Sequence, residues 1–284
     1  MYKTRLCLGL GGFDMEPEEQ IRFFKKVGFD GFFTGWDKNI EKYRAIADEI
    51  GMEYQSIHAP FGNAAKIWGN DENAQMAKNE LLDCVRDTAS VNVPIVIVHP
   101  YIGFGETEQP SECGLANFAE VVKLAEDLGV KIAFENVEGE RFLAALMERF
   151  KDSKNVGFCW DSGHELCYNR GKDMLALYGD RLIATHLNDN LGVSKYDGTI
   201  FWTDDLHLLP FDGIHDWKDV AARLKKTGFD GMLTFELTKS SKPGRYENDK
   251  YKAMSPESYI AEVYARACRL AYMMNGMDNL MNIH

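Results

Sequence analysis

The stretch Val156-Gly157-Phe158-Cys159-Trp160-Asp161-Ser162-Gly163-His164 joins an apolar run to an acid and, three residues later, to a histidine. A short buried strand followed by a turn would place Asp161 at the strand end and His164 just beyond it, with both side chains able to face one pocket. An aspartate in this position is also a common helix N-cap, so the pair alone is weak evidence for a site. The same pattern recurs along the chain, and this recurrence predicts the fold.

The rest of the chain alternates between short apolar runs and helical patterns that often stop at a glycine. The expected strands cover residues 5–10, 30–34, 53–57, 95–98, 130–134, 156–160, 181–185 and 230–235. The expected helices cover residues 17–28, 39–50, 72–90, 115–128, 139–150, 171–178, 215–227 and 255–275. Strict alternation with continuous apolar strands indicates parallel pairing through helical crossovers, and therefore an α/β fold.

A seven-residue repeat supports this architecture. The sequence KKVGFDG at 25–31 returns as KKTGFDG at 225–231, so the same helix end and strand entry occur near both ends of the chain. Eight strand–helix units in 284 residues predict one (β/α)8 TIM-barrel domain over residues 1–284, with the C-terminal helix at 255–275. An open doubly wound sheet is the alternative, although Gly9-Leu10-Gly11-Gly12 lacks the third glycine and the spacing of a dinucleotide fingerprint.

Composition limits the classes of function. With 45% hydrophobic and 12% aromatic residues, the chain can bury a large core, and a soluble enzyme is the default. A formal net charge of -12 opposes long-range attraction to DNA or to an anionic membrane. No apolar run approaches the roughly 18 residues of a spanning helix, and the apolar stretch near the start is too short for a signal peptide, so we expect a cytoplasmic protein. The six cysteines form no C-x-x-C pair and are expected to be reduced and mostly buried.

Ligand-type residues follow the last six expected strands, one after each strand. They are His58, His99, Glu135, Asp161, His186 and Glu236. In a barrel these strand ends meet at one mouth, where such folds carry their chemistry. Imidazole and carboxylate ligands without thiolates suit zinc, manganese, cobalt or iron(II), with magnesium if carboxylates dominate. We therefore expect a divalent metal centre, with Cys159 assigned to the core.

Seven short motifs give this pattern a family resemblance. They are Ile57-His58-Ala59-Pro60, Val98-His99-Pro100, Phe134-Glu135-Asn136, Asp161-Ser162-Gly163-His164, His186-Leu187-Asn188-Asp189, Asp205-Leu206-His207 with Asp216-Trp217, and Phe235-Glu236. As an ordered set over about 55–240, they resemble the xylose isomerase-like TIM-barrel superfamily. That group includes sugar isomerases and epimerases and the endonuclease IV family of AP endonucleases.

The resemblance implies different metal sites in different branches. In ketose 3-epimerase-like members, one metal would be held by Glu135, Asp161, His186 and Glu236, and His164 would contact the substrate. In endonuclease IV-like members, three zinc ions would use nine ligands. Those nine would be His58, His99, Glu135, Asp161, His164, His186, Asp205, His207 and Glu236. All nine residue types are present, so ligand identity does not choose the branch.

The surroundings of the expected mouth favour a sugar. The loops after strands two to four carry the aromatic residues Trp36, Phe61 and Trp68 but few cations, whereas a nuclease needs basic loops to hold phosphates. One basic tract, Lys239, Lys242, Arg245, Lys250 and Lys252, is mixed with acids and is interpreted as a solvated lid or a subunit contact. Aromatic walls beside a metal suit a small polyol, because sugars stack their C–H faces on rings.

We therefore expect a metal-dependent sugar isomerase or ketose epimerase that acts on a small sugar or polyol through an enediolate, with a metal-assisted hydride shift as an open alternative. Catalytic roles are expected for Glu135 and Glu236, which would bind the metal and move the proton, and for His164. Substrate contacts are expected from His58, His99, Trp36, Asp205 and His207. A zinc phosphodiesterase of the endonuclease IV type is the second hypothesis, and a barrel that binds a metal or metabolite without turnover is the third. A homo-oligomer is compatible with each of them.

Overall fold

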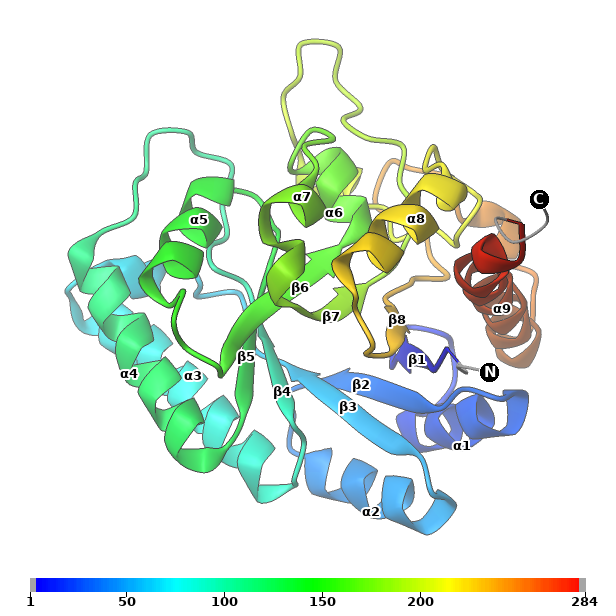
Figure 1. The fold of residues 1–284 in the computed structure, drawn as a ribbon, viewed down its shortest axis with the longest axis horizontal. Helices are drawn as coiled ribbons and strands as arrows, with labels where there is room; N and C mark the ends of the chain where they lie inside the picture. The colour runs from blue at the N-terminus through cyan, green and yellow to red at the C-terminus, as the bar shows by residue number, and fades with distance from the viewer. Residues whose placement is uncertain (1–3, 281–284) are drawn as a thin grey trace.

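Eight parallel strands lie at the centre of a ring of helices in the computed structural model, which describes residues 4–280 (Figure 1). The strands are β1 (Leu6–Gly9), β2 (Gly31–Gly35), β3 (Glu53–His58), β4 (Ile95–Val98), β5 (Lys131–Glu135), β6 (Val156–Asp161), β7 (Leu182–His186) and β8 (Leu233–Phe235). Their order is β7-β6-β5-β4-β3-β2-β1-β8, so β1 pairs with both β2 and β8. The expected (β/α)8 barrel is confirmed, and the open doubly wound sheet is wrong.

The barrel closes between β7 and β8 by a short seam rather than a full ladder. Leu187 and Phe235 form an isolated parallel bridge, and the Leu187 N–H donates to the Thr234 carbonyl at 2.8 Å. The Thr185 hydroxyl accepts the Thr234 N–H at 3.0 Å, so a side chain satisfies a backbone donor that no ladder partner reaches. The seam therefore brings the ends of β7 and β8 together, and the residues after both strands share one mouth.

The helices surround the strands on the outside of the barrel (Figure 1). They are α1 (Pro17–Val27), α2 (Ile40–Ile50), α3 (Glu72–Ser90), α4 (Glu112–Leu128), α5 (Glu140–Arg149), α6 (Ser162–Cys167), α7 (Met174–Tyr178), α8 (Trp217–Thr227) and α9 (Pro256–Leu280), with 3-10 turns η1 (Lys66–Trp68), η2 (Gly179–Arg181), η3 (Trp202–Asp204) and η4 (Asp249–Tyr251). Strict alternation is wrong at one point, because two helices, α6 and α7, follow β6. The C-terminal helix also continues past its expected end at 275.

The repeated KKxGFDG sequence has the same structural role at both positions. Helix α1 ends at Gly28 with φ 119°, and α8 ends at Gly228 with φ 74°, a left-handed conformation that glycine adopts without steric cost. The residues after each glycine lead into β2 and β8, which both pair with β1. Similar local sequences therefore place two strands on either side of the first one.

Strand β6 shows how residues alternate between the barrel interior and the helical layer. Cys159 packs inside the barrel with Ile97, Ala133 and Ala184, and is fully buried as expected. Since side chains two apart share a face, Asp161 also points inward, at the mouth above Cys159. Burial raises the pKa of the Cys159 thiol well above its ordinary value. This inert thiol belongs to the floor beneath the ligand-type residues.

Two further properties concern the cysteines and the polarity of the helices. All six cysteines are free thiols; four are buried, one is half-buried, and Cys113 is exposed. Within residues 4–280, every helix is too short or too polar to cross a lipid bilayer.

Candidate metal centre

The strand ends bring the six expected ligand-type residues into one cluster. His58, Glu135, Asp161 and His186 are the last residues of their strands, while His99 and Glu236 follow theirs directly. Glu135 lies at the centre of the cluster. Its Oε2 is 3.4 Å from His58 Nε2 and 3.3 Å from His99 Nε2, and its Oε1 is 3.1 Å from His186 Nδ1. His186 Nδ1 is also 3.1 Å from Glu236 Oε2.

Ligand atoms within 4.8 Å of one another form three candidate cation groups, two of which share Glu135 and His186. The groups are Glu135–Asp161–His186–Glu236, His58–Glu135–His186 and His164–Asp205–His207. His99 lies beside the second group, because its Nε2 is 3.2 Å from His58 Nε2. The structure therefore brings together all nine residues that the endonuclease IV-like ligand set requires, as well as the four of the epimerase-like set.

Asp161 serves both as a helix cap and as a member of the first group. Its Oδ1 accepts the His164 N–H at 2.6 Å and so caps α6, while its Oδ2 accepts the Asn188 amide at 2.9 Å. The Asn188 amide lies against Gly163, where an added Cβ would collide with it. Asp161 can therefore be both a helix N-cap and a site residue. The hydrogen bond that caps α6 also fixes the carboxylate and places His164 at the mouth of the barrel.

Several buried polar atoms in the cluster have no hydrogen-bond partner among the described residues, which leaves them free to coordinate a cation. In the described part of the chain, Glu135 Oε2, Asp205 Oδ1 and His99 Nδ1 are buried atoms with no hydrogen-bond partner of good geometry. Buried unpaired carboxylate oxygens are costly, and coordination to a cation would satisfy them. Carboxylates and imidazoles without a thiolate are the donors that divalent metals such as zinc and manganese accept. The residues therefore fit a divalent metal ion.

Electrostatic coupling within the cluster is strong. Burial raises the pKa of Asp161 to about 6, and the nearby carboxylates of Glu135 and Glu236 add to this. Burial alone would raise the pKa of Glu236, but His186 overrides it and lowers the value to about 2. The pKa of His207 is raised to about 9 by Asp205 against the effect of burial. Nearby imidazoles thus stabilise the charged form of Glu236, whereas burial and neighbouring carboxylates destabilise that of Asp161.

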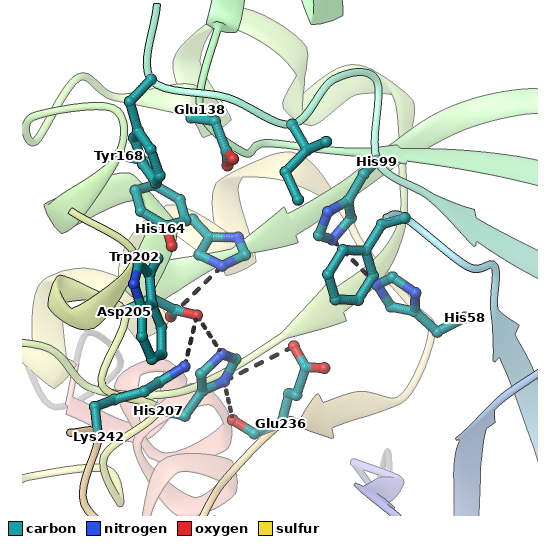
Figure 2. Close-up of a pocket in the computed structure, with 13 residues that line it drawn as sticks. His58, His99, Glu138, His164, Tyr168, Trp202, Asp205, His207, Glu236 and Lys242 are labelled. Carbon is teal, nitrogen blue, oxygen red and sulfur yellow. Dashed lines mark hydrogen bonds and ion pairs between the residues drawn. The ribbon is translucent and has the colours of Figure 1, made fainter. Parts of the chain in front are cut away.

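A cavity of about 320 Å³ opens directly above the cluster (Figure 2). Its lining residues are His58, Phe61, His99, Ile102, Phe104, Glu138, His164, Tyr168, Trp202, Asp205, His207, Glu236 and Lys242. The volume is at the lower end of the range of about 300–1,000 Å³ that is typical of small-molecule sites. Imidazoles and carboxylates form the floor, and aromatic rings form much of the wall.

Comparison with known proteins places this arrangement in a family. The family described as xylose isomerase-like TIM barrel matches residues 8–259. The chain belongs to the xylose isomerase-like TIM barrel family. An uncharacterised protein of Sinorhizobium fredii is 29% identical over 274 residues, covering 84% of this chain and 80% of the relative. The probable endonuclease 4 of Bacillus subtilis is 25% identical over 183 residues, covering 55% of this chain and 59% of the relative.

Solved structures agree on the fold. An L-ribulose 3-epimerase structure has a TM-score of 0.73 at 14% identity and covers 99% of both chains. The IolI protein with a bound zinc atom has a TM-score of 0.74 at 17% identity, covering 94% of this chain and 98% of that chain. At these identities the likeness shows a shared barrel fold, and the chemistry has to be argued from the residues.

The two glutamates expected to be catalytic in this xylose isomerase-like barrel differ in their access to the cavity. The Glu236 side chain is 28% exposed and lines the cavity, whereas the Glu135 side chain is 0% exposed and lies behind the histidines. His58, His99, His164, Asp205 and His207 all line the cavity, as a substrate-contacting role requires. Of these two glutamates, Glu236 is therefore the one with direct access to a ligand.

Two aromatic residues expected at the mouth lie elsewhere. The Trp36 indole donates to Asp87 Oδ2 at 2.9 Å on α3, so the expectation that it shapes the pocket is wrong. Trp68 is buried and donates to the Pro100 carbonyl at 2.8 Å, within the packing between η1 and α4. Of the three aromatic residues, Phe61 alone lines the cavity. The hydrogen bond of each indole directs the ring away from the mouth.

Several cavity residues were not expected from the sequence. They are Ile102, Phe104, Glu138, Tyr168, Trp202 and Lys242. The sequence does contain a signal for Glu138. It is an acid only three residues after Glu135, the last residue of a strand, and so it lies at the same end of the barrel. The others come from loops with no periodic pattern, and Trp202 provides the tryptophan wall that had been assigned to Trp36.

The basic tract after β8 anchors the loop after β7. Its five cations all pair with carboxylates, in the pairs Lys239–Asp14, Lys242–Asp205, Arg245–Asp204, Lys250–Asp212 and Lys252–Asp249. Lys250 and Lys252 have more than half of their side chains exposed, as a solvated segment would, whereas Lys239 and Arg245 are largely buried. Lys242 is the one lysine or arginine of the described chain that lines the cavity.

Asp189 organises the loop that carries Asp205 and His207. Its fully buried carboxylate accepts four N–H groups, from the backbone of Asn190, Phe211 and His215 and from the Trp217 indole, at 2.8–3.2 Å. A carboxylate can accept this many hydrogen bonds, whereas an amide has one oxygen. The residue therefore positions the third ligand group without belonging to it.

Replacing Asp189 by Asn is expected to lower the free energy of unfolding by about 1.5–3 kcal/mol, because hydrogen bonds to a charged group are lost and an NH2 group faces buried donors. Urea unfolding followed by circular dichroism would measure the change. Asp219→Asn is the matched control, since that side chain is 63% exposed. An equal and small effect of both substitutions would contradict the anchoring role.

Proposed function

We propose that this barrel is a divalent-metal-dependent isomerase or epimerase of a small sugar or polyol. The observation that carries the proposal is the position of Glu236, a carboxylate on the floor of an aromatic-walled cavity and within 3.1 Å of the metal-type ligand His186. A sugar can present its apolar C–H face to rings such as Phe61 and Trp202 while its oxygens face the ligand cluster.

Four residues would hold the ion in this proposal: Glu135, Asp161, His186 and Glu236. The ion would supply Lewis-acid polarisation of a carbonyl and the neighbouring hydroxyl, which would lower the pKa of the C–H between them. Glu236 lines the cavity, so it is the residue that removes this proton and, in an isomerisation, returns it to the neighbouring carbon. Glu135 is fully buried and does not line the cavity, so its role in this proposal is to hold the ion. His164 and His58 line the cavity on both sides of the cluster and orient the substrate oxygens.

One observation favours a second candidate, the zinc phosphodiesterase. His164, Asp205 and His207 form a separate cation group, and His58 and His99 approach Glu135 together, so three ions have candidate ligands. Against it stands the cavity itself, where Lys242 is the one lysine or arginine among the described residues and is already 3.5 Å from Asp205. A protein that grips a nucleic-acid backbone neutralises several phosphates with lysine and arginine side chains, and within residues 4–280 this cavity offers one such side chain.

The proposal is tested by a panel of ketoses, aldoses and inosose-type polyols incubated with the metal-loaded protein in deuterated water. Interconversion with deuterium in the product is expected for proton transfer through Glu236, and interconversion without deuterium would indicate a hydride shift. Metal analysis of the purified protein accompanies the assay. Three zinc ions per chain together with cleavage of an abasic-site duplex and no sugar conversion would replace the isomerase by the phosphodiesterase.

A further inference from the structure

A second cavity, of about 580 Å³, adjoins the one above the metal-type ligands. It is formed by residues 103–106, 138–141 and 197–200 with Tyr168 and Arg170. Three of its lining residues, Phe104, Glu138 and Tyr168, also line the first cavity, so the two spaces meet at these side chains. Either cavity is large enough for a small ligand, and together they suit a ligand with two parts.

Glu138 stands at the junction with one carboxylate oxygen unused. The residue is 7% exposed, and its Oε1 accepts the Gly103 N–H at 3.0 Å. No hydrogen bond reaches its Oε2 from residues 4–280, and the carboxylate points into the space between His99 and Tyr168 (Figure 2). An unpaired carboxylate oxygen that faces a cavity, on a residue that is otherwise largely buried, is a strong acceptor for a ligand hydroxyl.

The walls of the second cavity disfavour an anionic ligand. Four carboxylates, from Glu106, Glu138, Glu140 and Asp197, outnumber the guanidinium groups of Arg141 and Arg170. The Arg141 guanidinium donates to the carbonyls of Glu108 at 2.5 Å and Gly105 at 2.8 Å, and Arg170 lies 3.7 Å from Glu106. Because both cations already have partners and the net charge is negative, a phosphate group is disfavoured here.

The junction itself has the composition of a sugar-binding wall. The rings of Phe104 and Tyr168 lie with their centroids 5.8 Å apart, and Phe104 is 43% exposed. Aromatic faces next to a free carboxylate oxygen match the alternating C–H and O–H surfaces of a sugar ring. Glycines at 103, 105, 139 and 198 add no side chains to the remaining wall.

We propose that the second cavity binds a second sugar ring, and that the substrate is a neutral glycoside rather than a sugar phosphate. In this arrangement the reacting ring lies over the ligand cluster, Glu138 accepts a hydroxyl hydrogen bond near the glycosidic linkage, and the second ring occupies the space between residues 103–106 and 197–200. The inference rests on the proposed sugar chemistry of the first cavity and extends it to the class of substrate.

The test compares dissociation constants, measured by isothermal titration calorimetry on the metal-loaded protein. The ligands are D-fructose, its glucosides turanose, leucrose and isomaltulose, and D-fructose 6-phosphate. At least one glucoside is expected to bind about tenfold more tightly than fructose, which corresponds to about 1.4 kcal/mol, and the phosphate is expected to bind no more tightly than fructose. Thr199→Trp, which fills the second cavity from an exposed loop position, is expected to reduce the glucoside-to-fructose ratio to about one.

Control variants distinguish binding in the second cavity from binding in the first. Tyr196→Ala changes a fully exposed residue of the same loop that lines neither cavity, and it should keep the preference for the glucoside. Glu138→Gln should weaken glucoside binding more than fructose binding. Fructose binding without any tighter glucoside, or a preference that survives Thr199→Trp, overturns the subsite alone. If the protein binds none of these sugars and converts no sugar of the wider panel, the proposed function fails together with the subsite.

Discussion

Glu236→Gln is expected to lower turnover of any active sugar by about 10²–10⁴-fold, the range that a positioned general acid or base contributes. The side chain faces the cavity and lies 3.1 Å from His186 Nδ1. Glutamine preserves the size of the side chain and can still accept a hydrogen bond, but it cannot take up a proton. The measurement is the initial rate of sugar interconversion, together with the rate at which substrate C–H exchanges with deuterated water.

Loss of the metal ligand must be separated from loss of the base, because Glu236 is proposed to fill both roles. Metal content is therefore measured for the same samples, and rates are compared at saturating metal. Glu148→Gln is the matched control, since that side chain is 75% exposed and lies on α5 away from the mouth. Unchanged turnover in Glu236→Gln with its metal bound would exclude the proposed proton transfer.

Removal of the metal by a chelator is expected to lower the melting temperature by about 4–5 °C relative to protein at a hundredfold excess of metal over its dissociation constant. Binding at that excess contributes about 2.7 kcal/mol, and an unfolding entropy of about 2.1 cal/mol/K per residue makes each kcal/mol worth about 1.7 °C in a chain of 284 residues. The physical reason is the cluster of buried carboxylates, with Glu135 and Asp161 both 0% exposed. Differential scanning calorimetry with and without added zinc or manganese would measure the shift.

Asp161→Asn gives this prediction a sharp control. Asparagine caps helices as well as aspartate does, so α6 should still begin at Ser162, while the ligand charge is removed. In the metal-free state two effects oppose each other, because one of several buried carboxylates is gone but the Asn188 amide loses its acceptor Oδ2, so the variant is judged by its own shift on metal addition. Its melting temperature should respond little to added metal. A full metal-dependent shift in the variant would show that Asp161 is not a ligand.

Much of the fold was predictable because strand–helix alternation leaves a strong pattern. Each of the six ligand-type residues lies at the end of a strand or directly after it, as the apolar runs indicated. Helix α6 was not predicted, because six residues are too few to show a helical period and Ser162-Gly163 looks like a turn. Its existence changes the geometry at a decisive point, since it turns His164 towards Asp205.

The walls of the cavity were far less predictable than its floor. Strand ends converge by topology, whereas the direction of a loop side chain depends on partners distant in sequence. Trp36 is turned away by Asp87, 51 residues later, and Lys242 reaches the cavity because its loop is tied to the loop after β7. Sequence periodicity contains no information about such pairs, so the convergence of the strand-end residues could be predicted and the residues of the cavity wall could not.

The contact between Gly163 and Asn188 has a consequence for the sequences that this barrel can accept. An alanine at 163 would displace the amide that holds Asp161 Oδ2, although residue 163 itself binds nothing. Gly163 thus contributes to the site without contacting a ligand itself, and its replacement would loosen Asp161 through Asn188, which lies just after β7. A search for proteins of the same chemistry should therefore require a glycine at the position of Gly163 together with an asparagine at the position of Asn188.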